Sequence, residues 1–301
     1  MNRNLFILFA LISFSCGKYA NFTLPPPDAA GPKGPFHWEA AAEPILSKGD
    51  LSDVLNPSVV RFQGEYLNYY SGYDGHTWST ELAASSDGIH WTKRGQIRSP
   101  DAGNGSALVR GDRVMYWYQT GFPVQIALDG SIVLKTGPRG SWDERGVADP
   151  YVIERNGELY LYYLGMDRAR RQRLGVARSR DGVVWEKIIS NPIMELGAPG
   201  AFDEMGLGEP AVWSSGGWYW MLYTGRARGE KRRIRLAKST DGVHWSRESL
   251  IIEGDQAWDK EVICDPTVEV VPDGVRVWFG GGDVARPDWG LHGQIGVGML
   301  R

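Results

Sequence analysis

The sequence has little cysteine, no excess of either charge and no long hydrophobic segment, and each shortage excludes a class of protein. Two cysteines, Cys16 and Cys264, are too few for a disulfide scaffold. The 33 Lys+Arg and 36 Asp+Glu give a net charge of −3, which argues against a general nucleic-acid binder, because such a protein needs a basic surface. No apolar run reaches the roughly 20 residues of a membrane-spanning helix.

Aromatic residues and glycine are abundant instead. The 301 residues include 13 Trp, 13 Tyr and 39 Gly, and 42% of the sequence is hydrophobic and 23% charged. This composition is neither that of a disordered protein nor that of a fibrous one. Aromatic side chains favour strands, and glycine favours tight turns and bulges. The composition therefore predicts an all-β protein with many turns, of a size that fits one large domain or two ordinary ones.

The amino terminus has the pattern of an export signal. Arg3 precedes an apolar run over residues 5–12, which is too short to cross a bilayer and matches the hydrophobic part of a signal peptide. A small residue precedes Cys16, as in a bacterial lipoprotein signal. We therefore expect residues 1–16 to form an export signal, with a lipid on Cys16 as the membrane contact, and a periplasmic or outer-membrane location. Cleavage nearby without a lipid is the alternative. Residues 17–35 are rich in Pro and Gly and predict a tether.

A repeat runs through the rest of the sequence. Three units carry an aromatic-Asp pair followed, six residues after the Asp, by an acid and a proline, and the acids are Asp149, Glu209 and Asp265. An aromatic residue follows each proline by 13 positions, and the same spacing upstream finds Asn56 and Asn104 at the heads of two earlier units. The five heads lie 45 to 60 residues apart. Such self-similarity indicates a repeat architecture.

Each unit predicts four strands. A Ser-x-Asp-Gly-x-x-Trp turn occurs at residues 85–91, 179–185 and 239–245, and Asp-Gly is a strong hairpin signal. Four strands repeated about every 50 residues describe the blade of a β-propeller. The fifth unit lacks its last strand, which residues 36–46 resemble and are expected to supply. The predicted fold is all-β, a five-bladed β-propeller of residues 36–301 closed by an N-terminal strand.

Antiparallel strands within a blade decide which residues share a face. The five heads lie where the first strands begin, on the same face as the loops between second and third strands. Three carboxyl groups around one funnel repel one another, which raises the pKa of at least one. Such a set can hold an acid and a base for cleavage of a glycosidic bond. The alternative is that each acid only caps a neighbouring strand. The aspartates of the Asp-Gly turns lie on the opposite face and are expected to form turns: Asp87, Asp181 and Asp241.

The loops around this face carry candidate binding residues. Two adjacent loops are basic, and guanidinium groups suit carboxylate, sulfate or phosphate groups, so an anionic glycan or a phosphate co-substrate is one hypothesis. The alternative is charge pairing within the loops, with Asp167 and Glu230. Aromatic side chains at the rim, with Tyr73 among them, are either sugar-stacking surfaces or core. The candidates for substrate binding are Asn56, Asn104, Arg168, Arg170, Arg226, Arg228, Trp78, Trp289 and His292.

The segments Asn56-Pro57, Asp149-Pro150 and Glu209-Pro210, with the Asp-Gly turns, resemble the five-bladed propeller glycoside hydrolases of families 43, 32 and 68, and also family 130. In families 43 and 32 the resemblance implies an Asp as base or nucleophile in the first blade, a later orienting Asp and a Glu as general acid. By position Asp149 is the orienting residue and Glu209 the acid. The first-blade position is Asn56, and an amide can be neither a base nor a nucleophile. Asp265 or Asp53 is then expected to supply the base, and inversion is favoured over retention.

These observations predict an exported glycoside hydrolase that cleaves an oligo- or polysaccharide, with Asp149 and Glu209 transferring protons. The likeness to family 130 implies, as an alternative, a glycoside phosphorylase in which Asp149 is the proton donor. A non-catalytic glycan-binding surface lipoprotein is a third reading. No cofactor is expected. Some family 43 members hold calcium in the channel near a histidine, but a hydrogen-bonded loop position for His292 is favoured.

Overall fold

The computed structural model describes residues 18–301, so the predicted signal and Cys16 lie outside the described residues. The described part consists of 21 strands, β1 to β21, joined by turns and loops without a helix. Over the same range there is accordingly no helix with the length and apolarity needed to cross a membrane. The all-β prediction is confirmed.

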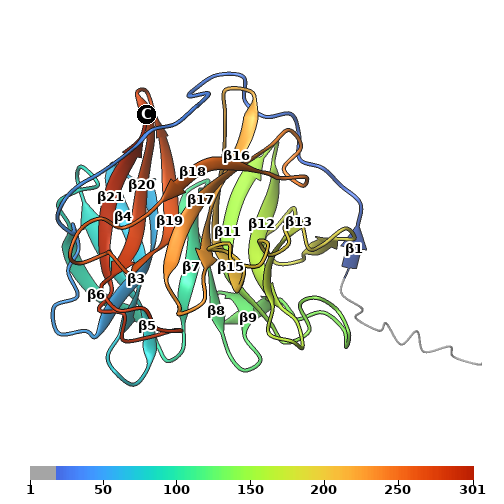
Figure 1. The fold of residues 1–301 in the computed structure, drawn as a ribbon. Helices are drawn as coiled ribbons and strands as arrows, with labels where there is room; N and C mark the ends of the chain where they lie inside the picture. Colours follow the sequence, from blue (N-terminus) through green and yellow to red (C-terminus); the bar gives the residue numbers. More distant parts are fainter. Residues whose placement is uncertain (1–17) are drawn as a thin grey trace, which may run out of the picture.

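The strands β2 to β21 form five blades of four antiparallel strands each, and in the first four blades the strands follow the order of the sequence (Figure 1). Blade one is β3 (Asp53–Phe62), β4 (Glu65–Tyr73), β5 (Trp78–Ser85) and β6 (Thr92–Arg98). Blade two is β7 (Gly103–Arg110), β8 (Arg113–Thr120), β9 (Gln125–Leu128) and β10 (Ser131–Leu134). Blade three is β11 (Gly146–Arg155), β12 (Glu158–Met166), β13 (Gln172–Ser179) and β14 (Glu186–Ile188). Blade four is β15 (Gly206–Ser215), β16 (Trp218–Arg226), β17 (Arg232–Ser239) and β18 (Ser246–Ile252).

Blade five is closed by the N-terminal segment, as predicted. Its strands are β19 (Val262–Val271), β20 (Gly274–Gly282), β21 (Gln294–Leu300) and β2 (Trp38–Ala40). In the β2–β21 pair Trp38 lies opposite Leu300. His37 and Arg301 extend the ladder by exchanging two backbone hydrogen bonds, at 2.6 and 2.9 Å. The ring is thereby closed with strands from both ends of the sequence, which protects the edge of blade five.

The Asp-Gly turns form as predicted and also join neighbouring blades. In the third blade the Asp181 carboxylate accepts the N–H groups of Val183 and Val184, at 2.8 and 2.9 Å. The indole N–H of Trp117, on blade two, donates to the carbonyl of Gly182 in this turn, at 2.9 Å. The turns of blades one and four receive equivalent bonds from the preceding blade, through Trp278 and Tyr162. Each such turn therefore fixes the contact between two blades.

The aromatic-Asp pairs of the repeat have a structural role. The ring of Trp142 lies against the backbone of Gly165, where an added Cβ would come within 2.2 Å of it. Asp143 is buried and accepts hydrogen bonds from Lys187 and from the Tyr163 hydroxyl. The contact between ring and glycine recurs in blades four and five, which explains why this part of the motif recurs. It packs the blade interior and takes no part in the funnel.

Residues 18–35 differ from the predicted free tether. β1 (Lys18–Ala20) pairs in parallel with β14, and the segment then crosses the end of the molecule that carries the C-terminus, as the blue stretch in Figure 1 shows. Leu24 is 5% exposed and packs in the core cluster of blades three and four. Asp28 forms two hydrogen bonds with Arg155, at 2.6 and 2.9 Å. Prolines favour an extended backbone, and here side chains of the propeller satisfy its carbonyls, as the Tyr219 hydroxyl does for Pro25 at 2.6 Å. We call residues 18–35 the strap.

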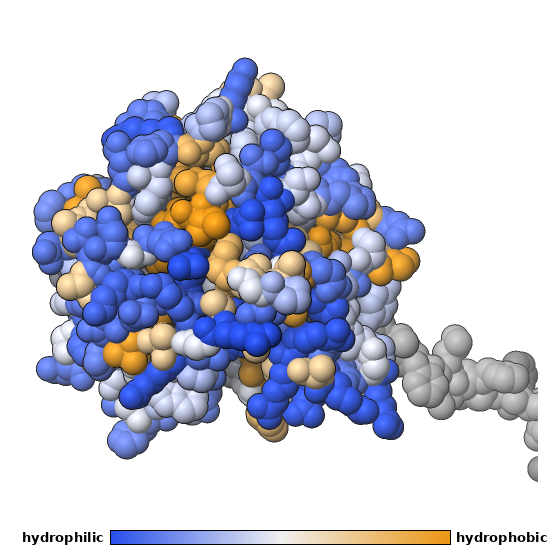
Figure 2. Space-filling view, viewed as in Figure 1, coloured by the Kyte–Doolittle hydropathy of each residue, from blue (hydrophilic) through white to orange (hydrophobic). Residues whose placement is uncertain are grey.

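The outer surface is largely polar. Figure 2 shows one side of the molecule, on which hydrophobic residues form separate patches among hydrophilic ones. The largest fully buried side chains are mostly aromatic residues of the second strands, such as Trp117, Tyr163, Tyr223 and Trp278. The many aromatic residues thus fill the space between blades, and few of them remain for the surface.

Candidate active site

All five first strands carry the same distortion at their head residue. Each has a break in register there and a positive φ, of 42° to 53°. Positive φ is tolerated by Asn and Asp and is unusual for Glu, and bulges of this kind redirect side chains near functional sites. The distorted residues are Asn56, Asn104, Asp149, Glu209 and Asp265.

These five side chains meet at the mouth of the central channel. One pocket is lined by all five heads and by the residues that follow them. The predicted convergence of residues from five separate blades is therefore observed. The structure brings Asp149, Glu209 and Asp265 together with Asn56 and Asn104, and it leaves Asp53 outside this set.

Hydrogen bonds link the heads of neighbouring blades. The Asp265 N–H donates to Oε2 of Glu209 at 3.2 Å, and the Asn56 N–H donates to Oδ2 of Asp265 at 3.1 Å. The Asn104 side-chain amide donates to Oδ1 of Asp149 at 3.2 Å. Acids thus do cap neighbouring strands, as the structural alternative expected. That role uses only part of each carboxyl group: Oδ1 of Asp265 is buried without a hydrogen-bond partner.

The crowding of carboxyl groups changes their protonation. Burial, followed by the charge of Glu209, raises the pKa of Asp149 to about 7, while the hydrogen bond from Asn104 acts in the opposite direction. Burial and then Glu209 also raise the pKa of Asp265 well above its usual range. At neutral pH Asp149 is therefore divided between its two forms, and Asp265 holds a proton more readily than an ordinary carboxyl group. This is the pattern expected for three acids in one funnel.

Arg232 faces this set, and sequence reasoning did not distinguish it from the other basic residues of its loop. It lies at the start of β17, opposite Val262 of β19. Its guanidinium donates to the carbonyls of Arg286 and Pro287, and its charge lowers the pKa of both Asp149 and Asp265. Alternation along the strand could have identified Arg232, because residues two apart point to the same face and Ile234 is buried.

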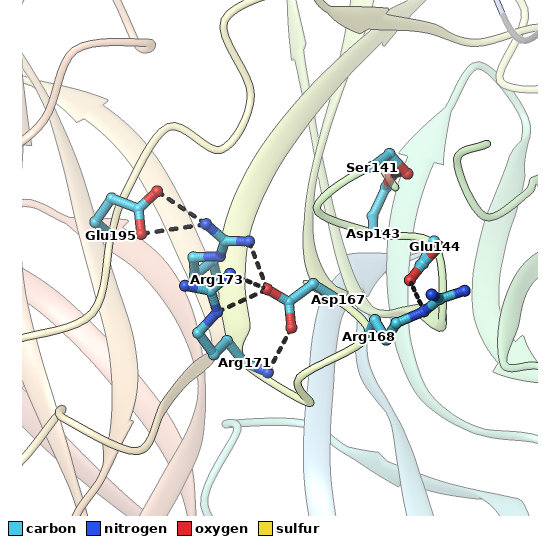
Figure 3. A network of polar contacts seen from close by, with 8 residues as sticks. All are labelled: Ser141, Asp143, Glu144, Asp167, Arg168, Arg171, Arg173 and Glu195. Atoms are coloured by element: carbon cyan, nitrogen blue, oxygen red, sulfur yellow. Dashed lines mark hydrogen bonds and ion pairs between the residues drawn. The ribbon is translucent and has the colours of Figure 1, made fainter. Parts of the chain in front are cut away.

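Several arginines of the basic loops form ion pairs with carboxylates of the protein. Arg168 contacts Glu144 at 3.1 Å, and Asp167 receives both Arg171 and Arg173, as Figure 3 shows. On the next blade Arg226 contacts Glu230 at 3.3 Å, and Arg228 contacts Glu204 at 3.0 Å. Arg170 adopts a positive φ of 61° in its loop. Asp167 and Glu230 thus pair within the loops, as the alternative expected, whereas Arg168 and Arg228 pair with acids outside their loops.

Two further candidates hold the loop between β20 and β21. Asp53 is completely buried and accepts the N–H groups of Gly290 and Gly293, at 2.6 and 2.8 Å. The prediction of Asp53 as a base is therefore wrong, because both of its oxygens are used by this loop. His292 contacts Asp283 at 2.8 Å, which agrees with the loop position expected for it.

The group of Glu209, Cys264 and Asp265 does not fit a calcium ion. Among the described residues, the ligand atoms of Glu209, Cys264 and Asp265 lie within 4.8 Å of one another. Calcium needs six to eight oxygen ligands, whereas this group offers a thiol. Burial raises the pKa of that thiol well above its usual range, and the S–H donates to Oδ2 of Asp265 at 3.1 Å. The positive charge of Arg232 beside the group also opposes a cation.

Aromatic side chains lie at the rim as expected. The rings of Tyr73 and Trp78 are 5.1 Å apart, and Trp289 lies 6.4 Å from Tyr73. Trp289 is 56% exposed. The three residues belong to the loop ends of blades one and five, on the face that carries the heads.

The fold and the ring of head residues define a propeller of the glycoside hydrolase type. Residues 56–264 match the family model described as "Glycosyl hydrolases family 32 N-terminal domain", and the protein belongs to this family. A curated relative, "Uncharacterized protein MT1551" of Mycobacterium tuberculosis (strain CDC 1551 / Oshkosh), is 30% identical over 173 residues, which cover 52% of this sequence and 57% of the relative. The match thus spans little more than half the length of that relative.

Solved structures share the fold at low sequence identity. Zg3597, a family 117 glycoside hydrolase of the marine bacterium Zobellia galactanivorans, aligns with a TM-score of 0.63 and 16% identity, covering 88% of this protein and 90% of that one. A structure of BT0996 in an RGII complex aligns with a TM-score of 0.69 and 16% identity, covering 89% of this protein and 92% of that one. The Bombyx mori GH32 beta-fructofuranosidase BmSUC1 gives 0.62 and 14%, over 88% of this protein and 62% of that one. The predicted resemblance to five-bladed propeller glycoside hydrolases is confirmed.

Proposed function

We propose that this protein is a glycoside hydrolase that cleaves an oligo- or polysaccharide by a single displacement with inversion. The observation that carries the proposal is the meeting of Asp149, Glu209 and Asp265 in one pocket, with the pKa of Asp149 at about 7. A carboxyl group with such a pKa can donate a proton at neutral pH. An adjacent ionised carboxylate can accept one, so both partners of an acid–base pair are supplied.

In the proposed step Asp149 is the general acid and Glu209 the general base. Glu209 removes a proton from a water molecule whose oxygen forms a bond to the anomeric carbon. The bond from that carbon to the glycosidic oxygen breaks, and the oxygen receives the proton of Asp149. The charge of Glu209 is itself a cause of the raised pKa of Asp149, which supports this assignment.

The amide at the first-blade position supports inversion. A retaining mechanism needs a carboxylate that attacks the anomeric carbon. The resemblance to families 43 and 32 implies an Asp at the first-blade position, where this protein has Asn56. The paired charges of the rim loops give no support to an anionic substrate, so the proposal is not restricted to one. The names of the structural neighbours suggest three first substrates: β-fructofuranosides such as sucrose and inulin, α-L-arabinofuranosides such as arabinan, and RGII.

Substrates with different leaving groups test the two roles. Asp149→Asn should lower kcat/KM on a natural glycoside on the order of 10²–10⁴-fold. It should lose far less on an activated aryl glycoside, whose leaving group needs no proton. Glu209→Gln should lose activity on both. The family pattern assigns the acid role to Glu209, so the reverse result would exchange the two roles. Equal small losses for both variants would contradict catalysis and favour a glycan-binding protein.

Two product assays test the attacking group and the stereochemistry. Proton NMR of the first product formed should show the inverted anomer. Added inorganic phosphate should leave the rate unchanged and give no sugar phosphate. A phosphate-dependent rate would instead establish a phosphorylase of the family 130 type.

We also propose that the protein is exported and carries a lipid on Cys16. The apolar run and the small residue before Cys16 support this. Because β1 begins at Lys18 and pairs with blade three, a lipid at Cys16 would hold that blade close to the membrane. Labelling of cells with a radioactive fatty acid should mark the wild type, and Cys16→Ala should abolish the label and release the protein from the membrane fraction.

A further inference from the structure

The rim of the mouth has a part with several arginine ion pairs and an aromatic part. The loops between second and third strands of blades three and four carry the ion pairs of Asp167 and of Arg226 with Glu230. The same loops of blades five and one carry Trp289, Tyr73 and Trp78 in mutual contact. Blade two completes the aromatic part with a residue that no prediction named.

Phe122 is that residue, and the fold leaves it uncovered. It lies in the loop between β8 and β9, on the face of the head residues, and it is 98% exposed. Among the large hydrophobic residues that the structure describes it has the highest exposed fraction. The other aromatic side chains at this face have partners within the protein, whereas the ring of Phe122 offers both of its faces to solvent. An exposed aromatic ring on the face that carries the pocket is a candidate surface for stacking against a ligand ring.

The loop of Phe122 is attached to the strand that carries Asp149. The carbonyl of Val124 accepts the N–H of Val147 at 3.0 Å, and Val124 forms a parallel bridge with Gly146. On the other side of the loop, the side-chain oxygen of Gln119 accepts the N–H of Asp149 at 3.3 Å. Backbone contacts therefore hold the loop to the first strand of blade three. Phe122 is in this way fixed relative to the proposed acid.

We propose that Phe122 forms a distal subsite in which a sugar ring stacks on the phenyl face, and that the saccharide lies across the aromatic part of the rim, over blades five, one and two. The apolar C–H face of a neutral sugar ring can stack on an exposed aromatic ring. A subsite outside the pocket of the heads implies that the substrate has several sugar units. This inference rests on the proposed function only in taking a saccharide as the ligand of this face.

A binding experiment tests the subsite separately from catalysis. In the inactive Glu209→Gln background, affinity electrophoresis with inulin, arabinan and RGII as probes should show retardation by at least one of them. Phe122→Ala should raise the apparent Kd for that probe about five-fold, and Phe122→Trp should restore it to within about two-fold of Phe122. The matched control is Val184→Ala, which removes an apolar side chain that is 49% exposed in an Asp-Gly turn of the opposite face. It should bind like the parent.

Several results would overturn the subsite. They are retardation by none of the three probes, unchanged binding by Phe122→Ala, and an equal loss in Val184→Ala. If Phe122 instead joins two copies of the protein, Phe122→Ala would abolish a dimer seen by light scattering and leave glycan binding unchanged. If binding depends on Phe122 but the wild-type protein hydrolyses none of the probes, the proposed function is refuted and the subsite is retained. For an active enzyme, Phe122→Ala should also reduce the ratio of kcat/KM between long and short oligosaccharides.

Discussion

The side-chain amide of Asn104 donates a hydrogen bond to Oδ1 of Asp149 at 3.2 Å, across the boundary between blades two and three. This bond favours the charged form of the Asp149 carboxyl group, while burial and Glu209 favour the neutral form. The pKa of about 7 is the balance of these effects. Asn104 cannot itself transfer a proton, but its hydrogen bond helps to set the pH range in which Asp149 can donate one.

The first prediction concerns this balance. Asn104→Ala removes the donor, so the pKa of Asp149 should rise further. If Asp149 is the general acid, the rate falls as pH increases through its pKa, and the alkaline limb of the kcat/KM profile should move to higher pH by on the order of one unit. If the alkaline limb does not move in a variant with unchanged Tm, the titration of a group other than Asp149 is responsible for it.

The second prediction concerns stability. The folded-state pKa of Asp149 lies above the ordinary value of 3.8, so the folded state binds a proton more tightly than the unfolded state. Its contribution is favourable below the unfolded pKa and is lost as pH rises from about 4 to about 7. Asp149→Asn should therefore stabilise the protein at pH 8 by up to about 4 kcal/mol, and much less at pH 4. Urea unfolding at the two pH values measures the difference, and an equal change at both would contradict the raised pKa.

The third prediction separates Arg232 from the other basic residues. Arg232→Gln removes a positive charge that lowers the pKa of Asp149 and Asp265, so the alkaline limb should move to higher pH and activity at neutral pH should change. Arg232→Lys keeps the charge and should restore much of the wild-type profile. The control is Arg113→Gln, an exposed position at the start of β8 far from the heads. A profile of Arg232→Gln identical to that of this control would remove Arg232 from the site.

The fourth prediction tests the strap. Leu24→Ala removes a buried side chain from the core cluster of blades three and four, and should lower the free energy of unfolding by about 2–4 kcal/mol. The matched control is Ile89→Ala, at a position 41% exposed in the Asp-Gly turn of blade one, which should cost less than about 0.5 kcal/mol. Because the strap lies at the end opposite the heads, KM should be the same in both variants. Equal stability of the two would mean that the strap is a free tether after all.

Sequence patterns predicted the architecture because the repeat is built from local chemistry. An Asp-Gly turn forms wherever Asp181 and its equivalents can accept two backbone N–H groups, whatever the rest of the sequence does. The closing strand was predictable because β2 repeats the pattern of a fourth strand. The convergence of the heads followed from the spacing alone, since antiparallel strands return to the same face.

The parts that sequence could not predict depend on contacts between distant segments. Arg168 and Arg228 look equivalent to Arg232 in the sequence, and only the packing of blade four against blade five separates them. Asp53 lies three residues before a head, but the loop between β20 and β21 takes both of its oxygens. The composition of residues 18–35 gives no indication that Leu24 enters the core.

The closure of blade five has a consequence for how the molecule is made. β2 precedes all four of the other blades in the order of synthesis, and its partner β21 follows them. Until β21 has been made, β2 has no strand to pair with, and the ring of blades cannot close. Closure of the ring therefore depends on a pairing between strands from the two ends of the sequence and forms only after the last strand has been made.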